Sequence, residues 1–249
     1  MPLIHTECLT LRRRRTRDAD ALVTLFSRQC GKVTASTRSA LKTASRYAGV
    51  TQPFNRLHVV LYAKTEDQEI WTLTQTAPIR QYQSLQEDLS RMAYASCLAE
   101  WIDLLSGDFE SNAEVWDLLL NAFERWDAGT PLREDLFFYQ WHLLMKAGLQ
   151  PEITRCRDCG REEQSGWFYR PDQGGLVCNA CRSEGVFLSG GAVQALRKIA
   201  GSDSIPAVRL SANQKKEITL ALKIHLEYYM GAQPRANLFL EQISRINDP

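Results

Sequence analysis

The sequence predicts an α+β protein of two modules, a five-stranded barrel over residues 1–80 and a helical domain over residues 81–249. Three observations lead to this prediction. Short segments before Pro78 have the composition and alternation of strands, and later segments repeat apolar residues at helical spacing. Two Cys-x-x-Cys pairs interrupt the helical part within a loop-rich insert, residues 154–185.

Five segments of the first module read as strands because they are rich in β-branched and apolar residues and are separated by turn residues. They cover residues 6–13, 21–27, 31–37, 57–63 and 70–79. Five short strands in so short a module fit a barrel of the oligonucleotide-binding (OB) type.

The connection between the third and fourth predicted strands is long for a hairpin loop and carries Arg38, Lys42 and Arg46. Residues four apart share one face of a helix, so these three cations would point the same way if the segment became helical.

Five segments of the second module have a helical period and cover residues 84–107, 111–129, 130–148, 188–201 and 211–231. Ser84 with Glu87, and Ser211 with Gln214, form predicted capping boxes. Gly231 is a typical residue to end the last of these helices.

Charge is distributed unevenly along the chain although the total is only +1. Residues 1–80 hold 13 basic and 6 acidic side chains, whereas residues 81–155 hold 5 basic and 13 acidic ones. This asymmetry indicates that a polyanion binds to the first module and is kept away from the second.

The four cysteines of the insert have the spacing of a metal site. Cys156 and Cys159 precede Cys178 and Cys181 by the interval typical of four-thiolate zinc sites. Four thiolates fill a tetrahedron and leave no position for water, so the predicted Zn²⁺ is structural. Two alternatives stay open: a thiol redox pair, and direct nucleic-acid binding by the neighbouring arginines, which are Arg155, Arg157, Arg161, Arg170 and Arg182.

The cations of the first module form a predicted footprint for phosphates. Along the first strand, alternation places Arg12 and Arg14 on one face and Arg13 and Arg15 on the other. Because few aromatic side chains are available for stacking, we expect binding through the backbone with little sequence preference. The residues predicted to contact DNA are Arg14, Lys32, Arg38, Lys42 and Arg46.

Other motifs exclude several activities. The chain has no Walker phosphate loop, no HExxH and no GxSxG, which argues against ATP hydrolysis and against these hydrolase classes. His142 fits a satisfied core residue better than a catalytic base. No apolar run is long enough to span a membrane and no signal peptide is evident, so we expect a cytoplasmic protein.

Four stretches of the chain, in this order, resemble the bacterial recombination mediator family RecO. The stretch "ADALVTLFSRQCGKVTA" is similar to the family's early strand and Gly-Lys turn, and "ASRYAGVTQPFNRLHVVLY" to its Gln-Pro-Phe segment. The stretch "EDLSRMAYASCLAEWIDLL" resembles its first helix, and "CRDCGREEQSGWFYRPDQGGLVCNACR" resembles its zinc segment.

The resemblance implies an OB-fold domain, a helical domain and a zinc insert. It also implies binding of single- and double-stranded DNA and annealing of complementary strands without ATP. The implied partners are RecR and single-strand-binding protein, and indirectly RecA, on bacterial DNA under repair at the nucleoid. Two other classes remain as alternatives, a zinc-containing nucleic-acid-processing enzyme and a thiol redox sensor.

Overall fold

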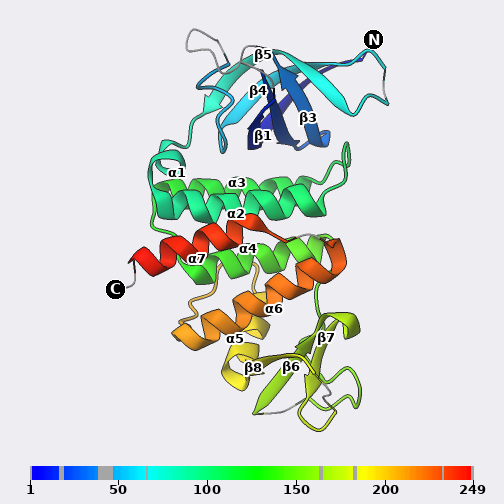
Figure 1. Cartoon of the computed structure of the whole chain (residues 1–249), viewed down its shortest axis with the longest axis vertical. Helices are drawn as coiled ribbons and strands as arrows, with labels where there is room; N and C mark the ends of the chain where they lie inside the picture. The colour runs from blue at the N-terminus through cyan, green and yellow to red at the C-terminus, as the bar shows by residue number, and fades with distance from the viewer. Residues whose placement is uncertain are drawn as a thin grey trace. The chain divides into compact units, whose positions relative to one another are not determined.

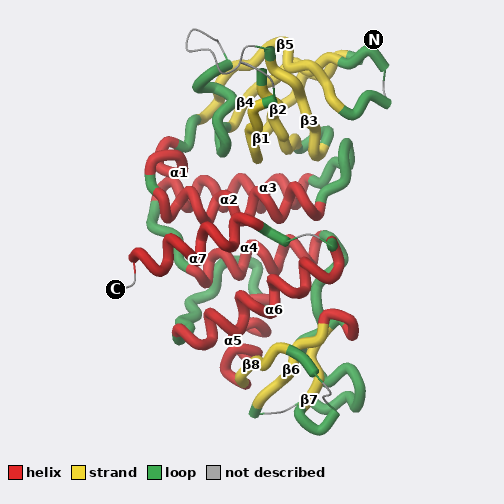
Figure 2. Tube along the Cα trace, in the orientation of Figure 1, coloured by secondary structure: helices red, strands yellow, loops and turns green. Residues whose placement is uncertain are grey.

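The protein is described by a computed structural model that covers residues 2–16, 20–38, 47–65, 67–162, 165–181, 184–231 and 233–247. Its chain forms two compact units (Figures 1 and 2). The first unit comprises Met1–Pro131 together with Ala236–Pro249, and the second comprises Leu132–Arg235. Among the described residues, no helix has the length and apolar character needed to cross a membrane.

The first unit contains a closed barrel of five strands, as predicted. Its strands are β1 (Leu3–Arg15), β2 (Ala21–Ser27), β3 (Gly31–Thr37), β4 (Arg56–Tyr62) and β5 (Ile70–Arg80). They close in the order β1-β2-β3-β5-β4, and only the β3–β5 pair is parallel. This arrangement confirms the predicted OB-like barrel.

The barrel interior is filled by alternate residues of its strands, as the period of two requires. On β2, Ala21, Val23 and Leu25 are buried in this core, and on β3 the core residues are Val33 and Ala35. The register of β1 shifts between Thr10 and Arg12, where a bulge interrupts its pairing with β2. After this bulge, the arginines of β1 again point alternately to the two faces of the strand, but in the shifted register.

Four helices complete the first unit: α1 (Gln83–Glu87), α2 (Leu89–Leu105), α3 (Ala113–Ala128) and α7 (Arg235–Asn247). The prediction of one helix over residues 84–107 is wrong, because the chain is extended at Asp88 with φ −97° and ψ 120°. The Asp88 carboxylate accepts the Arg91 N–H at 2.9 Å and caps α2, while Ser84 caps no helix. Aspartate is at least as good an N-cap as serine, so the helix restarts there.

Helix α7 was not predicted from the sequence. It lies beside α2 in Figure 1, and the N–H of Ala236 near its start donates to Glu100 of α2 at 2.7 Å. Residues far apart in the sequence thus join in one helical layer of the first unit.

The turn between β2 and β3 packs on the connection between α2 and α3. Phe109 donates its N–H to the carbonyl of Lys32 at 2.9 Å. Gly31 has φ +68°, and a Cβ added there would overlap the carbonyl group of Glu110. The sequence places glycine where the backbone of the helical connection leaves no room for a Cβ.

The described residues of the second unit form three helices, a short 3-10 turn and a small sheet. The elements are α4 (Arg133–Lys146), β6 (Gly166–Arg170), the 3-10 turn η1 (Pro171–Gln173), β7 (Gly175–Cys178), β8 (Val186–Ser189), α5 (Gly190–Ala200) and α6 (Ala212–Met230). The sheet has the order β7-β6-β8 and was not predicted. The capping box at Ser211 and the left-handed Gly231 at the end of α6 are confirmed.

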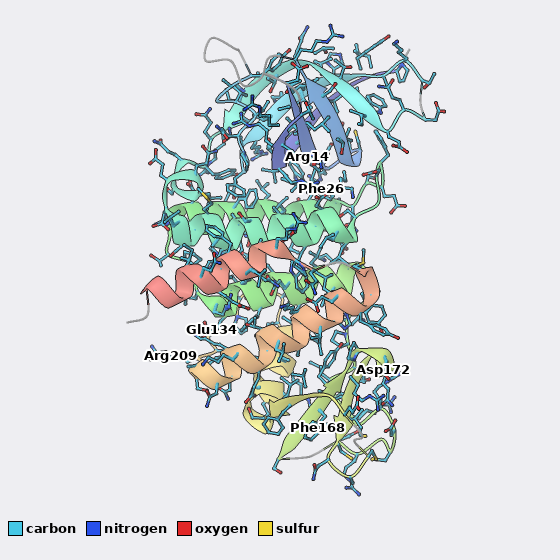
Figure 3. The ribbon with its side chains drawn as sticks, in the orientation of Figure 1. Arg14, Phe26, Glu134, Phe168, Asp172 and Arg209 are labelled. Atoms are coloured by element: carbon cyan, nitrogen blue, oxygen red, sulfur yellow. The ribbon has the colours of Figure 1, made fainter. Side chains whose placement is uncertain are left out.

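Buried polar contacts attach the parts of the second unit to α4 and α6. Glu134, near Arg209 in Figure 3, accepts the N–H of Leu210 at 3.1 Å. The Tyr169 hydroxyl of β6 meets Nδ1 of His225, whose Nε2 lies 2.6 Å from the carbonyl of Leu149. His142 is also buried, with ring nitrogens 2.9 Å and 3.0 Å from main-chain carbonyls, in agreement with a core role.

Candidate nucleic-acid interface and metal centre

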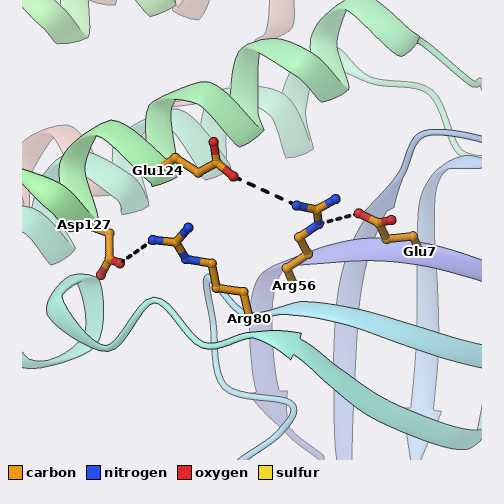
Figure 4. A network of polar contacts seen from close by, with 5 residues as sticks. All are labelled: Glu7, Arg56, Arg80, Glu124 and Asp127. Atoms are coloured by element: carbon orange, nitrogen blue, oxygen red, sulfur yellow. Dashed lines mark hydrogen bonds and ion pairs between the residues drawn. The ribbon is translucent and has the colours of Figure 1, made fainter.

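Carboxylates of the helical layer neutralise many of the barrel's cations. These ion pairs lie within the first unit, and Figure 4 shows two of them together with the contact between Arg56 and Glu7. They join Arg12 to Asp103 (3.0 Å), Arg28 to Asp117 (3.5 Å), Lys32 to Asp103 (3.7 Å) and Asp108 (3.5 Å), Arg56 to Glu124 (3.9 Å), and Arg80 to Asp127 (3.2 Å).

These pairs give the uneven charge of the sequence a structural explanation. Part of the positive charge of the barrel meets the negative charge of α2 and α3 within one folded unit. Arg56 is held from both sides, because it pairs with Glu124 of α3 and also donates a hydrogen bond to Glu7 of β1, which raises its pKa above the usual value. The barrel cations that the helices leave uncovered are therefore the ones that remain available to an anionic ligand.

A shallow polar groove of about 220 Å³ lies on the outer face of β1, β2 and β3. Its lining contains Arg12, Arg14, Leu22, Thr24, Thr34, Glu69, Ile70 and Asp108. Arg12 and Arg14 share this groove, as the alternation along β1 predicted. OB-folds bind oligonucleotides on the face of strands 2 and 3, between the β1–β2 and β4–β5 connections. The groove lies on that strand face and reaches Glu69 of the β4–β5 connection.

Three exposed arginines supply positive charge around the groove or the barrel end next to it. Arg14 and Arg15 end β1, and Arg38 follows β3. Within the described ranges, no carboxylate forms an ion pair with any of the three. Figure 3 labels Arg14 on the barrel. The predicted residues Lys42 and Arg46 lie outside the described residues.

Lys32 differs from the other predicted DNA-contacting residues. Its side chain is only 15% exposed, and its ammonium group donates to the carbonyl of Asp103 at 2.8 Å as well as pairing with two carboxylates. Sequence reasoning recognised the cation but not its partners, which come from a loop and a helix about seventy residues away. The contacts of Lys32 indicate a structural role for it.

Arg13 joins β1 to the segment that precedes β4. Its guanidinium donates to the carbonyl of Ala48 at 2.6 Å and lies 3.5 Å from the hydroxyl of Thr51. Burial lowers the pKa of Arg13. The acceptors are uncharged, so this cation differs from the ion-paired ones.

The second unit brings Cys156, Cys159, Cys178 and Cys181 together, with all four sulfur atoms within 4.8 Å of one another. The Sγ atoms of Cys159 and Cys178 are 3.7 Å apart. A tetrahedral zinc site with Zn–S bonds of about 2.3 Å requires sulfur atoms roughly 3.8 Å apart, so the cluster fits such an ion. Two turns hold the ligands, residues 157–159 after Cys156 and residues 179–181 after β7.

The protonation of these thiols also fits a cation. Burial raises the pKa of Cys156, but backbone N–H donors, including that of Cys178 at 3.3 Å, outweigh burial and bring the pKa down to about 6. Hydrogen bonds with Cys159 and Cys178 raise the pKa of Cys181 to about 12. The protein alone thus favours thiolate at one ligand and opposes it at another, and a bound metal would supply the missing positive charge.

The arginines of the insert are partly engaged with the protein itself. Arg157 donates to the carbonyl of Gln173 at 3.0 Å, and Arg170 pairs with Asp172 at 2.6 Å. Within the described part of the insert these contacts favour an architectural role for the two arginines over a nucleic-acid contact.

Comparison with known proteins agrees with both the barrel and the cysteine unit. The family model "Recombination protein O N terminal" matches residues 1–82, and "Recombination protein O C terminal" matches residues 86–238. The chain belongs to the RecO family. Two curated RecO relatives share 32% identity with it. The protein from Heliobacterium modesticaldum matches over 98% of this chain and 92% of its own length, and that from Symbiobacterium thermophilum over 98% of both.

A third RecO relative, from Bacillus velezensis, is 29% identical over 99% of this chain and 97% of its own length. All three relatives are named DNA repair protein RecO. RecO membership therefore rests on nearly the whole chain, including both the barrel and the cysteine unit.

Proposed function

We propose that this protein is a DNA-binding recombination mediator that acts in DNA repair without covalent chemistry. In this proposal it anneals complementary single strands without ATP. With RecR, it helps RecA load onto DNA coated with single-strand-binding protein. The observation that carries the proposal is the polar groove on β1–β3, where Arg14 has no carboxylate partner among the described residues and lies beside Thr24 and Thr34. Arg12 also lines the groove but is paired with Asp103. RecO family membership supports the biological role.

Phosphate contacts explain how one face can serve annealing. Arg14, Arg15 and Arg38 attract the backbone, whereas the described lining of the groove contains no aromatic side chain on which a base could stack. A strand held through its phosphates keeps most of its bases free to pair. Lys42 and Arg46 remain part of the proposed contact set, and Lys32 leaves it because of its intramolecular contacts.

The cysteine cluster supports a mediator better than a zinc enzyme. Four thiolates would hold a structural Zn²⁺ with every tetrahedral position filled by protein. The proposed function of the ion is to tie the turn at Cys156 to the end of β7, and thus to stabilise the sheet that packs on α6. The redox alternative requires reversible disulfides instead of bound metal.

Salt-dependent DNA binding tests the groove. Arg14→Ala should weaken binding to all sequences and reduce the slope of log K against log salt by about 0.7 on single strands. Arg28→Ala is the matched control. Arg28 is also an exposed arginine of the barrel, but it lies at the end of β2 away from Arg14 and is paired with Asp117 of α3. Equal losses in the two variants would contradict the groove as the binding face.

The loop prediction has its own test. Replacing Arg38, Lys42 and Arg46 together by alanine should weaken binding for every sequence and flatten the salt dependence. Wild-type affinity with a wild-type slope would remove this loop from the contact set.

The mediator role is tested by strand annealing on DNA coated with single-strand-binding protein, without ATP. We expect the wild-type protein to accelerate annealing and Arg14→Ala to lose most of that acceleration. RecA filament formation on the same DNA, with and without RecR, measures the loading step. No acceleration by the wild-type protein would overturn the proposal.

A further inference from the structure

A second, larger pocket lies in the first unit, between the Gln52–Phe54 segment of the barrel, helix α2 and the start of α7. Its volume is about 640 Å³, within the range of roughly 300–1,000 Å³ typical of small-molecule sites. Its lining comprises Leu11, Arg12, Arg13, Gln52, Pro53, Phe54, Gln86, Met92, Ser96, Ala99, Glu100, Asp103 and Ala236. The proposed DNA-binding groove uses only Arg12 from this set.

The walls of this pocket are firmly held. Phe54 has φ +71°, donates its N–H to the carbonyl of Thr10 at 2.7 Å, and packs its ring on Phe123 with centroids 5.5 Å apart. Gln86 donates to the carbonyl of Pro53 at 2.9 Å and to Asn55 at 2.8 Å. The pocket is therefore a preformed cavity between rigid elements.

One cation of the pocket, Arg13, is placed to receive an anionic group. Of the pocket's two carboxylates, Asp103 pairs with Arg12 and Lys32, and Glu100 lies at the α7 end of the pocket, where it accepts the Ala236 N–H. Arg13, by contrast, contacts only uncharged oxygens, and among the described residues no carboxylate pairs with it. A half-buried guanidinium without a counterion gains most from an anion.

The pocket adjoins the groove in which we place the phosphates. Arg12 lines both cavities, so a strand that follows the groove past Arg12 brings its next nucleotide to the pocket. Leu11, Met92 and Ala99 present apolar surface there, which suits the faces of an unstacked base. Gln52 and Ser96 add polar groups without demanding one base identity.

We propose that this pocket holds one unstacked nucleotide of the bound single strand, with its base against Met92 and Ala99 and its phosphate toward Arg13. The inference rests on the proposed function and deepens it. A paired base cannot enter the pocket, so the pocket favours a single strand over the duplex. Annealing removes the nucleotide from its site and thereby weakens the protein's hold on the product.

The test compares an oligothymidylate with a strand of the same length that lacks all bases. The wild-type protein should bind the abasic strand about tenfold more weakly, because one base contact is worth roughly 1.4 kcal/mol. Ser96→Trp fills the pocket and should bind both strands equally. Ser90→Trp, on α2 but outside the pocket lining, should keep the wild-type preference.

Circular dichroism and thermal unfolding establish that each variant folds. If Ser96→Trp does not fold, Met92→Glu decides, since it places a carboxylate in the pocket without adding bulk and should also abolish the preference. Retention of the tenfold preference in a folded pocket variant overturns the inference. Equal affinity of the wild-type protein for both strands also overturns the inference. That result would indicate that the pocket binds a protein segment instead of a nucleotide.

These outcomes are distinct from a failure of the proposed function. Wild-type protein that binds neither strand contradicts the groove and the pocket together. If the wild-type protein binds both strands equally and Arg14→Ala weakens both, the groove remains supported as the DNA-binding face. Only the nucleotide pocket is then contradicted.

Discussion

The ammonium group of Lys32 donates a hydrogen bond to the main-chain carbonyl of Asp103 at 2.8 Å, which fixes strand β3 to helix α2. Both side chains are less than one-fifth exposed. A lysine in a basic module thus stabilises the barrel on its helical support.

Lys32→Ala should lower the free energy of unfolding by about 1–3 kcal/mol, because it removes the donor to the Asp103 carbonyl and leaves the Asp103 carboxylate with Arg12 alone. Urea unfolding checks this value. Arg28→Ala, which breaks a pair with both side chains 58% exposed, should cost about 0–1 kcal/mol. If Lys32→Ala instead kept full stability and lost DNA affinity, the original assignment of Lys32 to phosphate binding would be restored.

Sequence reasoning located the barrel because its evidence is local. Strands 21–27 and 31–37 have their predicted bounds, since turn residues flank both segments. The clustering of the four cysteines was also predictable, because the spacing of metal ligands can be seen directly in the sequence. Alternation also placed Arg12 and Arg14 correctly on one face.

The errors involve partners that lie far away in sequence. The break at Asp88 replaces one predicted helix by two, and α7 joins the first unit although it follows the second in the chain. The sheet of the insert forms between strands too short to show a reliable period. The role of Lys32 was mispredicted for the same reason, since no local pattern shows that its carboxylate partners lie on another element.

Metal removal should destabilise the second unit selectively. We expect a chelator under reducing conditions to lower its melting temperature, because metal binding to a folded site contributes directly to folding free energy. Cys159→Ser should release zinc and lower the melting temperature in the same way. Cys30→Ser, in the barrel unit, should keep both the zinc and the wild-type melting temperature. Metal analysis and differential scanning calorimetry measure both properties. Freshly reduced protein with no zinc and an unchanged melting temperature would favour the redox alternative.

The stability of the second unit should depend on pH through His225. Burial lowers the pKa of His225 below its usual 6.5, so the folded state resists protonation that the unfolded chain accepts. The unfolded state then binds more protons, and stability falls as pH drops below 6.5 toward the folded pKa. Above 6.5 this contribution is fully present.

Hydrogen exchange of α6 amides at pH values from about 8 to about 5 measures this dependence. His225→Gln should reduce the pH dependence, because an amide does not titrate in this range. His58→Gln is the control, since His58 is exposed on β4 and belongs to the other unit. An identical pH profile in wild type and His225→Gln would assign the dependence to other groups.

Gly31 supplies the sharpest test of the junction between barrel and helices. Gly31→Ala should cost at least about 1–2 kcal/mol, because alanine must adopt φ +68° and its Cβ must displace the Glu110 carbonyl. Gly49→Ala is a matched control in the same unit, since a Cβ there meets no atom within 4 Å. We expect that variant to stay within about 0.5 kcal/mol of wild type. Equal urea midpoints for the two variants would show that the helical connection does not press on the β2–β3 turn.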